Sequence, residues 1–335
     1  MGKINNVLIT GITGFVGSHM ADYILANHPT VKIIGMARWR SPVDNIRNIL
    51  GRITLEYGDL LDPFSLKKTI GDYKPDVVFH LAAQSYVHFS FLAPTATLET
   101  NVIGTCNLLE VIKELKLAQG YDPVVHICSS SEVYGQVKES DIPIKEETPL
   151  RPASPYAVSK VGEDMLAYQY WLSWKIRTIR TRMFTHTGPR RGHVFALSNF
   201  AKQVAAIESG LQPPVVKVGN LKSVRTFTDV RDAVKAYWLL VAKCGPGEVY
   251  NIGGVETMEI GEMLNRLLKL SVAKDIKIEV DPARLRPSDV TLQIPSTEKF
   301  YLVTGWKPEI KFQQTIEDTL NYWRSFYKAQ ICMEY

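Results

Sequence analysis

A glycine-rich turn near the start of the chain limits its possible folds more than any other feature. Asn6–Thr10 predicts a short buried strand, Gly11, Gly14 and Gly17 follow at intervals of three residues, and Ser18–Ala26 predicts an amphipathic helix. A strand, a glycine turn and a helix in this order form a dinucleotide fingerprint, because glycines admit the pyrophosphate and the helix N-terminus supplies N–H groups. We therefore predict a dinucleotide site rather than a turn without a ligand. The expected contacts are Gly11, Thr13, Gly14, Phe15, Val16 and Gly17.

Predicted strands and helices alternate through about residue 182. The further predicted strands are Lys32–Met36, Thr54–Tyr57, Val77–Leu81, Val124–Cys128 and Arg177–Arg182. The predicted helices after the first are Ala96–Leu117 and Tyr156–Trp174. This alternation predicts an α/β fold of the Rossmann type, with a doubly wound parallel sheet covered on both faces. The functional site is then expected in the cleft at the carboxyl ends of the strands.

Two short segments predict acid–base chemistry. Tyr156 and Lys160 are four residues apart on a predicted helix and therefore share a face. The lysine charge is expected to lower the tyrosine pKa, so that the phenol takes a proton from a hydroxyl near neutral pH. Ser130 and Glu132 follow a predicted strand and would complete the site with a hydroxyl and a carboxylate.

Together these motifs resemble the extended short-chain dehydrogenase/reductase family, in particular its nucleotide-sugar-modifying branch. The resemblance covers the chain from about Asn6 to Trp323 and includes Gly58-Asp59-Leu60, His80-Leu81-Ala82-Ala83 and Asn101. It implies that Asp59 and Leu60 lie near adenine and that Leu81, Ala82 and Ala83 lie along the cofactor. It also implies two parts: a cofactor-binding Rossmann domain of residues 1–183 plus about 225–255, and a smaller C-terminal α/β substrate lobe of about 184–224 and 256–335.

The segment after the second predicted strand bears on the choice of cofactor. An acidic residue there would accept hydrogen bonds from the ribose 2′-hydroxyl of NAD, whereas arginine suits the 2′-phosphate of NADP. The chain has Arg38, Arg40 and Ser41 at this place, with no acid before Asp44. We therefore predict NADP, with Arg38 as the stronger contact of the two arginines.

Within the family, the segment around Glu132 most resembles the GDP-mannose 4,6-dehydratases, with Ser130 where they carry threonine. This resemblance implies that Tyr156, assisted by Lys160, removes the proton of the sugar O4 while hydride leaves C4. Glu132 then takes the C5 proton and donates a proton to the C6 hydroxyl, which leaves as water. The hydride finally returns to C6. Ser130 would hydrogen-bond O4. The chain departs from the family pattern at Thr185, which stands where the family has asparagine.

Two other functions stay open. The first is an NADPH-dependent GDP-4-keto-6-deoxymannose reductase, because the segments Val218–Leu221, Phe227–Asp232 and Arg284–Ser288 resemble such enzymes. Those reductases tend to have an acid at Val133 and a lysine at Gln84, which this chain lacks. The second is a non-catalytic protein that senses NADP(H), although a sensor has no need of the serine, tyrosine, lysine and glutamate together.

The substrate is expected to be a GDP-sugar, an assignment that rests on the resemblance alone. Paired arginines suit a diphosphate, and the family binds the substrate nucleotide at the positions of Asn220, Arg225 and Arg286. GDP-mannose and GDP-manno-heptose differ at C6 of the sugar, so the choice between them depends on the pocket near the sugar. The residues expected in this substrate site are Gln84, Ser85, Ser131, Thr185, Asn220, Arg225 and Arg286.

Composition excludes several classes of partner. The net charge of +5 is mild, and no run of lysine and arginine marks a nucleic-acid surface. The cysteines at 106, 128, 244 and 332 have no metal-ligand spacing, and neither they nor the histidines predict a metal site. No apolar run is long enough for a membrane span or a signal peptide. We expect a cytoplasmic protein with reduced thiols, which forms a homodimer through apolar residues of Tyr156–Trp174 and Ala96–Leu117. The resemblance also allows a tetramer, in which the segment Arg38–Ser41 reaches the cofactor of a neighbouring subunit.

Overall fold

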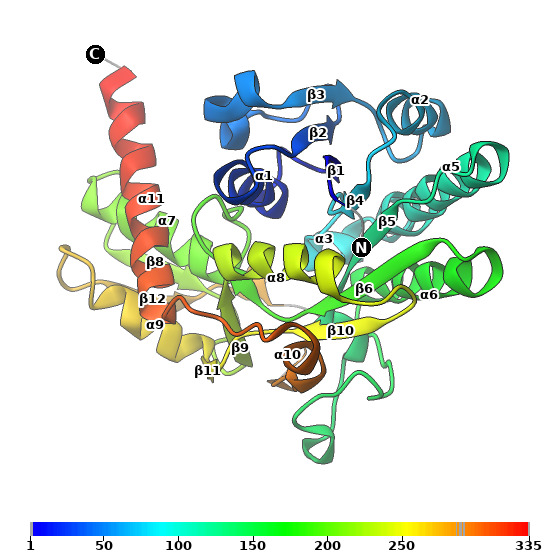
Figure 1. Ribbon diagram of the computed structural model, residues 1–335. Coiled ribbons are helices and arrows are strands. Elements are labelled where there is room, and N and C mark those ends of the chain that lie inside the picture. The colour runs from blue at the N-terminus through cyan, green and yellow to red at the C-terminus, as the bar shows by residue number, and fades with distance from the viewer. Residues whose placement is uncertain (1–2, 286, 288–289, 291, 334–335) are drawn as a thin grey trace.

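A computed structural model describes residues 3–285, 287, 290 and 292–333 of the chain. Its main element is a seven-stranded sheet with the strand order β10-β6-β5-β4-β1-β2-β3, in which all neighbours are parallel (Figure 1). The strands are β1 (Asn6–Thr10), β2 (Lys32–Ala37), β3 (Thr54–Tyr57), β4 (Val77–His80), β5 (Val124–Ser130), β6 (Arg177–Met183) and β10 (Val249–Ile252). The predicted parallel Rossmann-type sheet is confirmed, and each predicted strand is correct to within two residues at its ends.

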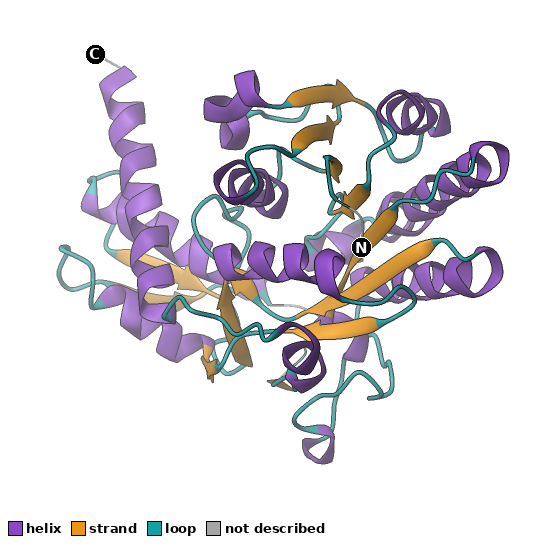
Figure 2. Cartoon of the chain, viewed as in Figure 1, coloured by secondary structure: helices purple, strands orange, loops and turns teal. Residues whose placement is uncertain are grey.

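Helices cover both faces of this sheet and create two apolar cores (Figure 2). Alternate residues of a strand point to opposite faces. The helices around the sheet are α1 (Phe15–Asn27), α2 (Pro63–Tyr73), α3 (Val87–Leu92), α4 (Pro94–Leu98), α5 (Gly104–Gln119), α6 (Pro155–Trp174), α8 (Val230–Lys243) and α10 (Glu298–Thr304). Val7 and Ile9 of β1 accordingly pack with α1 and α8, whereas Leu8 packs with α2, α5 and α6. Short 3₁₀ helices span Asp44–Arg52, Ser131–Tyr134, Glu139–Asp141 and Pro282–Arg284.

The start of α6 follows from its local sequence. The Ser154 hydroxyl accepts a hydrogen bond from the Ala157 N–H at 3.0 Å, which caps the helix. Pro155 occupies the first helical position, where its missing N–H costs nothing. These two residues fix where the helix begins, and therefore fix Tyr156 in its first turn.

The predicted helical run over Ala96–Leu117 is confirmed, but the helix is not regular along its whole length. A π-helical turn, Glu99–Ile103, separates α4 from α5. Asn101 lies in this wide turn and donates hydrogen bonds to the Ser159 hydroxyl on α6 at 2.8 Å and to the Gln84 carbonyl at 3.0 Å. Its side-chain oxygen accepts from the Gln84 N–H at 2.8 Å. Such a turn re-aims a side chain that regular spacing would place elsewhere, and here it ties the loop after β4 to α6.

The second half of the chain contributes a smaller group of elements with its own apolar core. One small sheet pairs β8 (Val215–Val218) with β12 (Lys277–Val280); another joins β7 (His186–Thr187), β9 (Val224–Asp229), β11 (Glu256–Glu259) and β13 (Leu292–Gln293). Its helices are α7 (Ala196–Glu208), α9 (Ile260–Leu268) and α11 (Phe312–Met333), with α11 lying along α7 (Figure 1). Strand β10 lies at the edge of the main sheet, and α8 packs into one of its cores. The division into a cofactor-binding domain and a substrate lobe stays a prediction, and these separate cores are consistent with it.

Candidate active site

The glycine turn after β1 forms a cradle, and the backbone around it leaves no room for a side chain at Gly11 or Gly17. Gly11 has a φ of +71°, and a Cβ atom there would lie 2.9 Å from the Cα of Ala82. A Cβ at Gly17 would lie 2.3 Å from the Gly11 carbonyl oxygen. Helix α1 begins directly after Gly14 without a side-chain cap, so its first N–H groups remain available to an anion. The predicted helix started three residues later, at Ser18; in the structure α1 already begins at Phe15.

This turn lines a cavity of about 620 Å³ at the carboxyl ends of the parallel strands, which we call the glycine-turn cavity. The volume is typical of a small-molecule site. Of the predicted cofactor contacts, Arg40 is absent from the lining. The predicted contacts that do line it are Gly11, Thr13, Gly14, Phe15, Val16, Gly17, Arg38, Ser41, Asp59, Leu60, Leu81, Ala82, Ala83, Tyr156 and Lys160. Cradle, free helix N–H groups and volume together fit a dinucleotide.

Ser130, Tyr156 and Lys160 all line this cavity. Ser130 is the last residue of β5, and the other two lie in the first turns of α6. Tyr156 is hydrogen-bonded to Ser130. Both residues also line a second cavity of about 330 Å³, so they stand where the two cavities join. The structure thus brings together the three groups that the sequence proposed for proton transfer at a hydroxyl.

The Lys160 charge lowers the pKa of Tyr156 as expected, but it does not determine the net shift in the chain by itself. Burial raises the pKa of Tyr156 above its ordinary value, although the Lys160 charge and the Ser130 hydrogen bond act in the opposite direction. The Lys160 ammonium lies 2.7 Å from the Glu163 carboxylate, and the side chains are 5% and 1% exposed. Burial lowers the pKa of Lys160, but the Glu163 and Tyr156 charges outweigh it and leave that pKa raised. Sequence spacing revealed the lysine but not the carboxylate that offsets its charge.

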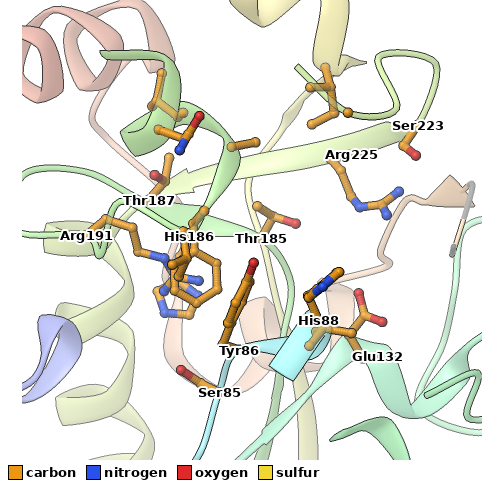
Figure 3. Close-up of a pocket in the computed structure, with 18 of the residues that line it drawn as sticks. Ser85, Tyr86, His88, Glu132, Thr185, His186, Thr187, Arg191, Ser223 and Arg225 are labelled. Carbon is orange, nitrogen blue, oxygen red and sulfur yellow. The ribbon is translucent and has the colours of Figure 1, made fainter. Parts of the chain in front are cut away.

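The second cavity holds the carboxylate that the sequence proposed for catalysis. Glu132 lies on the 3₁₀ turn that follows Ser130, and its N–H donates a hydrogen bond to the Ser130 hydroxyl at 3.2 Å. The Glu132 side chain points into the cavity (Figure 3). Ser85, Ser131, Thr185, Asn220 and Arg225, all predicted substrate contacts, line the same cavity. A base on one side and the Ser130–Tyr156 pair on another can act on neighbouring atoms of one bound molecule.

Two predicted substrate contacts are placed differently. The Gln84 amide accepts from the Tyr86 N–H at 2.6 Å and donates to the Thr97 hydroxyl at 2.9 Å, and the residue lines the glycine-turn cavity instead. Its side chain thus shapes the loop after β4. Arg286 lies outside the described residues.

Arginines give the second cavity a positive character. Arg225 is buried and donates to the carbonyl oxygens of Val224 and Val290. Arg191, to which the sequence assigned no role, lines both cavities. Its guanidinium lies 3.6 Å from the ring centre of Phe195. Burial lowers the pKa of Arg191 to about 10, so that the side chain remains a cation at neutral pH. A bound diphosphate would find a desolvated positive charge at the junction of the cavities.

Other lining residues escaped the sequence reasoning. Tyr86 and His88 follow Ser85 closely and face the second cavity, where their rings stack with centroids 5.9 Å apart (Figure 3). His186 and Arg284 line it as well. The available signal was proximity to predicted site residues, because the residue types tyrosine, histidine and arginine do not by themselves indicate whether a side chain is buried or exposed.

Comparisons with known proteins identify the family of this chain. The model of the family described as GDP-mannose 4,6 dehydratase matches residues 8–319. The chain is 34% identical over 319 residues to GDP-6-deoxy-D-mannose reductase of Pseudomonas aeruginosa, covering 95% of this chain and 97% of the relative. It is 33% identical over 350 residues to GDP-mannose 4,6-dehydratase of Vibrio cholerae serotype O1, covering 93% and 91%. The human GDP-mannose 4,6 dehydratase is 30% identical over 355 residues, covering 96% and 92%.

Solved structures share the fold of this chain. The structure of RMD from Pseudomonas aeruginosa complexed with NADPH superimposes with a TM-score of 0.82 at 33% identity, covering 96% of this chain and 99% of that one. dTDP-glucose 4,6-dehydratase of Bacillus anthracis in complex with NAD gives a TM-score of 0.80 at 28% identity, covering 96% of each chain. A nicotinamide cofactor is thus bound by similar structures.

Proposed function

Because this chain belongs to the GDP-mannose 4,6-dehydratase family, we propose that it is a GDP-sugar 4,6-dehydratase with bound NADP. The substrate would be GDP-mannose or GDP-manno-heptose, and the product its 4-keto-6-deoxy derivative. One observation carries the proposal: Glu132 projects into the cavity that Ser130 and Tyr156 also line. Removal of a C5 proton needs such a base in addition to the group that acts on O4.

Each residue has a defined task in this reaction. Tyr156 takes the proton of the sugar O4, and Ser130 donates a hydrogen bond to the same oxygen. The glycine-turn cavity and Lys160 would hold NADP, which would supply the acceptor for the C4 hydride and the source of the hydride that returns to C6. Glu132 removes the C5 proton, which the adjacent ketone has made acidic, and then protonates the C6 oxygen as it leaves as water. When the hydride reaches C6, C5 takes up one proton, equal in number to the proton that Tyr156 gained from O4, so both balances close and no external reductant is consumed.

A second candidate is an NADPH-dependent GDP-4-keto-6-deoxymannose reductase. The alignment with the Pseudomonas reductase spans 319 positions and covers 97% of that protein. The alignment with the Vibrio dehydratase needs 350 positions, more than the 335 residues of this chain, and therefore contains gaps. The raised pKa of Tyr156 also suits a reductase, because a protonated phenol can donate to the carbonyl oxygen of a ketone.

One pair of incubations separates the candidates. The protein is mixed with GDP-mannose or GDP-manno-heptose without added NADPH, and products are examined by mass spectrometry. A dehydratase gives a product lighter by one water. A reductase leaves both sugars unchanged but oxidises NADPH when GDP-4-keto-6-deoxymannose is supplied. A protein that only senses NADP(H) binds the cofactor and does neither.

NADP is proposed over NAD on the character of the cavity wall next to β2. Arg38 and Ser41 line the glycine-turn cavity just beyond the strand end, and the segment Ala37–Ser41 contains no acidic side chain. The relative solved with NADPH supports this choice. Titration calorimetry should show NADP binding more than threefold more tightly than NAD, and Arg38→Ala should remove most of that preference. Equal affinities in the unmodified protein would contradict the assignment.

Assembly as a homodimer, with a tetramer as alternative, is also proposed. Helix α6 exposes Met165, Tyr168, Leu172 and Trp174, whereas Tyr170, which the sequence placed in the same apolar surface, packs into the core. An exposed apolar patch of this kind commonly marks an interface.

A cytoplasmic location stays a prediction. Within the described residues, no helix combines the length and the apolar character that a membrane span requires.

A further inference from the structure

A buried carboxylate next to the catalytic pair has no task in the reaction outlined above. Glu163 lies one helical turn beyond Lys160 on α6, and its side chain is 1% exposed. Its Oε2 atom accepts a hydrogen bond from the Lys160 ammonium at 2.7 Å. Its Oε1 atom is buried and has no hydrogen-bond partner among the described residues. An unsatisfied buried carboxylate oxygen costs stability, so its retention calls for a functional reason.

The charges around this group single out Glu163. Lys160 interacts with Cys128 and Tyr156, and the field of Lys160 also acts on His80 and His126 in β4 and β5. Asp164, the next residue, is engaged by arginines of β6. Tyr156 interacts further with Ser130, Cys128, Tyr237 of α8 and Arg191. Among the described residues, Glu163 is therefore the carboxylate that neutralises Lys160 directly.

We propose that Glu163 is a positioning residue: it holds the Lys160 ammonium and offsets its charge, and thereby limits how strongly Lys160 acts on Tyr156. It does not touch the sugar in this arrangement; it acts through the lysine. A larger offset favours the protonated phenol, which donates to a ketone oxygen, and a smaller offset favours the phenolate, which accepts the O4 proton in the dehydratase direction. The inference rests on the proposed role of Tyr156 and is independent of which sugar is bound.

The electrostatics agree in sign with this proposal. Burial and, to a smaller extent, the Glu163 charge raise the pKa of Tyr156, while Lys160 lowers it. Burial also raises the pKa of Glu163 to about 7, so this carboxylate carries its full charge in the alkaline range in which a tyrosine titrates. Glu163→Gln keeps an oxygen that can accept from the Lys160 ammonium but removes the negative charge. The positive charge of Lys160 then acts on Tyr156 without compensation. A neighbouring unit charge shifts a pKa by about 1–3 units, so proton affinity should fall about tenfold or more.

The test is a spectroscopic titration of Tyr156, which needs no substrate. Tyrosinate absorbance is recorded against pH for four proteins: unmodified, Tyr156→Phe, Glu163→Gln and the double variant. Subtracting each Tyr156→Phe curve isolates the Tyr156 titration. Its midpoint should fall by about one pH unit in Glu163→Gln, with the pH profile of turnover shifting by the same amount. Glu146→Gln removes another half-buried carboxylate, which accepts from the Asn251 N–H, and should leave the midpoint unchanged.

Two outcomes would overturn the proposal. The first is a Glu163→Gln midpoint that stays within about 0.3 units of the unmodified protein or moves upward. The second needs no Glu163 variant and so survives a folding defect: Tyr156 in the unmodified protein titrating below the ordinary tyrosine value of about 10. A protein that fails to dehydrate either GDP-sugar but shows the expected titration would refute the proposed function alone.

Discussion

Asp164 should be among the most sensitive positions for stability, because it fastens the catalytic helix to the sheet. The carboxylate is fully buried on α6 and accepts from Arg180 Nη1 at 2.9 Å and from Arg182 Nε at 2.8 Å. A third hydrogen bond comes from Arg182 Nη2 at 3.3 Å. Both arginines belong to β6 and are nearly as buried as the aspartate. Asp164→Asn removes the one negative charge that both guanidinium groups share.

The expected loss follows from what the arginines retain. Breaking a buried ion pair by removing one partner costs about 3–5 kcal/mol. Arg182 keeps hydrogen bonds to the Tyr134 hydroxyl at 3.1 Å and the Glu146 carbonyl at 2.8 Å, and Arg180 keeps one to the Gly247 carbonyl at 2.8 Å. These remaining bonds place the expected cost at the lower end, about 3 kcal/mol. That is a large share of a total stability of about 5–15 kcal/mol.

Urea unfolding followed by circular dichroism measures this loss. The matched control is Asp44→Asn, which removes a carboxylate 2.6 Å from Arg47 at a site where both side chains are about two-thirds exposed (68% and 71%). That exposed pair should contribute about 0–1 kcal/mol. A loss in Asp164→Asn no greater than that of the control would refute the reasoning that the buried charge holds α6 in place.

Three further predictions concern the site and the assembly. Glu132→Gln should keep NADP binding but lose dehydration by about 10²–10⁴-fold, together with deuterium exchange at C5; normal exchange would rule out Glu132 as the C5 base. Tyr156→Phe should abolish even transient NADPH absorbance on addition of the sugar, and near-normal turnover would make its hydroxyl structural. Leu172→Glu should shift the protein toward monomer in light scattering, whereas Leu302→Glu, at an exposed leucine on α10, should not; identical masses for the two variants would exclude this face of α6 as the interface.

The first half of the fold was predictable because its signals are local. Four of its strands, β1, β2, β4 and β5, are short runs rich in apolar residues that end in a glycine or polar segment, and the parallel arrangement follows from the alternation with helices. The π-helical turn at Glu99–Ile103 was not predictable in this way. Its widening depends on Asn101 finding partners in the loop after β4 and on α6, and such long-range contacts leave no periodic trace in the sequence.

The substrate side of the site was harder to predict than the cofactor side. The glycine cradle and the Tyr156–Lys160 spacing each lie within one local motif, so sequence order almost determines their geometry. The second cavity instead collects residues from segments far apart in the chain, such as His88, Thr185 and Arg225. Arg190 and Arg191 illustrate the difficulty: the first pairs with Asp22 at 2.6 Å, and the second enters both cavities. Two adjacent identical side chains carry no sign of which one turns inward.

The same difficulty explains why the charge balance at Lys160 was misjudged. Glu163 and Asp164 are consecutive acids, a pair that in a helix usually marks a solvated face. Consecutive residues point about 100° apart around a helix, and here both directions lead into the protein: Asp164 to the arginines of β6, and Glu163 to Lys160. One acid therefore holds α6 against the sheet while its neighbour acts on the group that α6 presents to the cavity. Asp164→Asn should therefore lower the free energy of unfolding with little change in the midpoint of the Tyr156 titration. Glu163→Gln should lower that midpoint with little change in the free energy of unfolding.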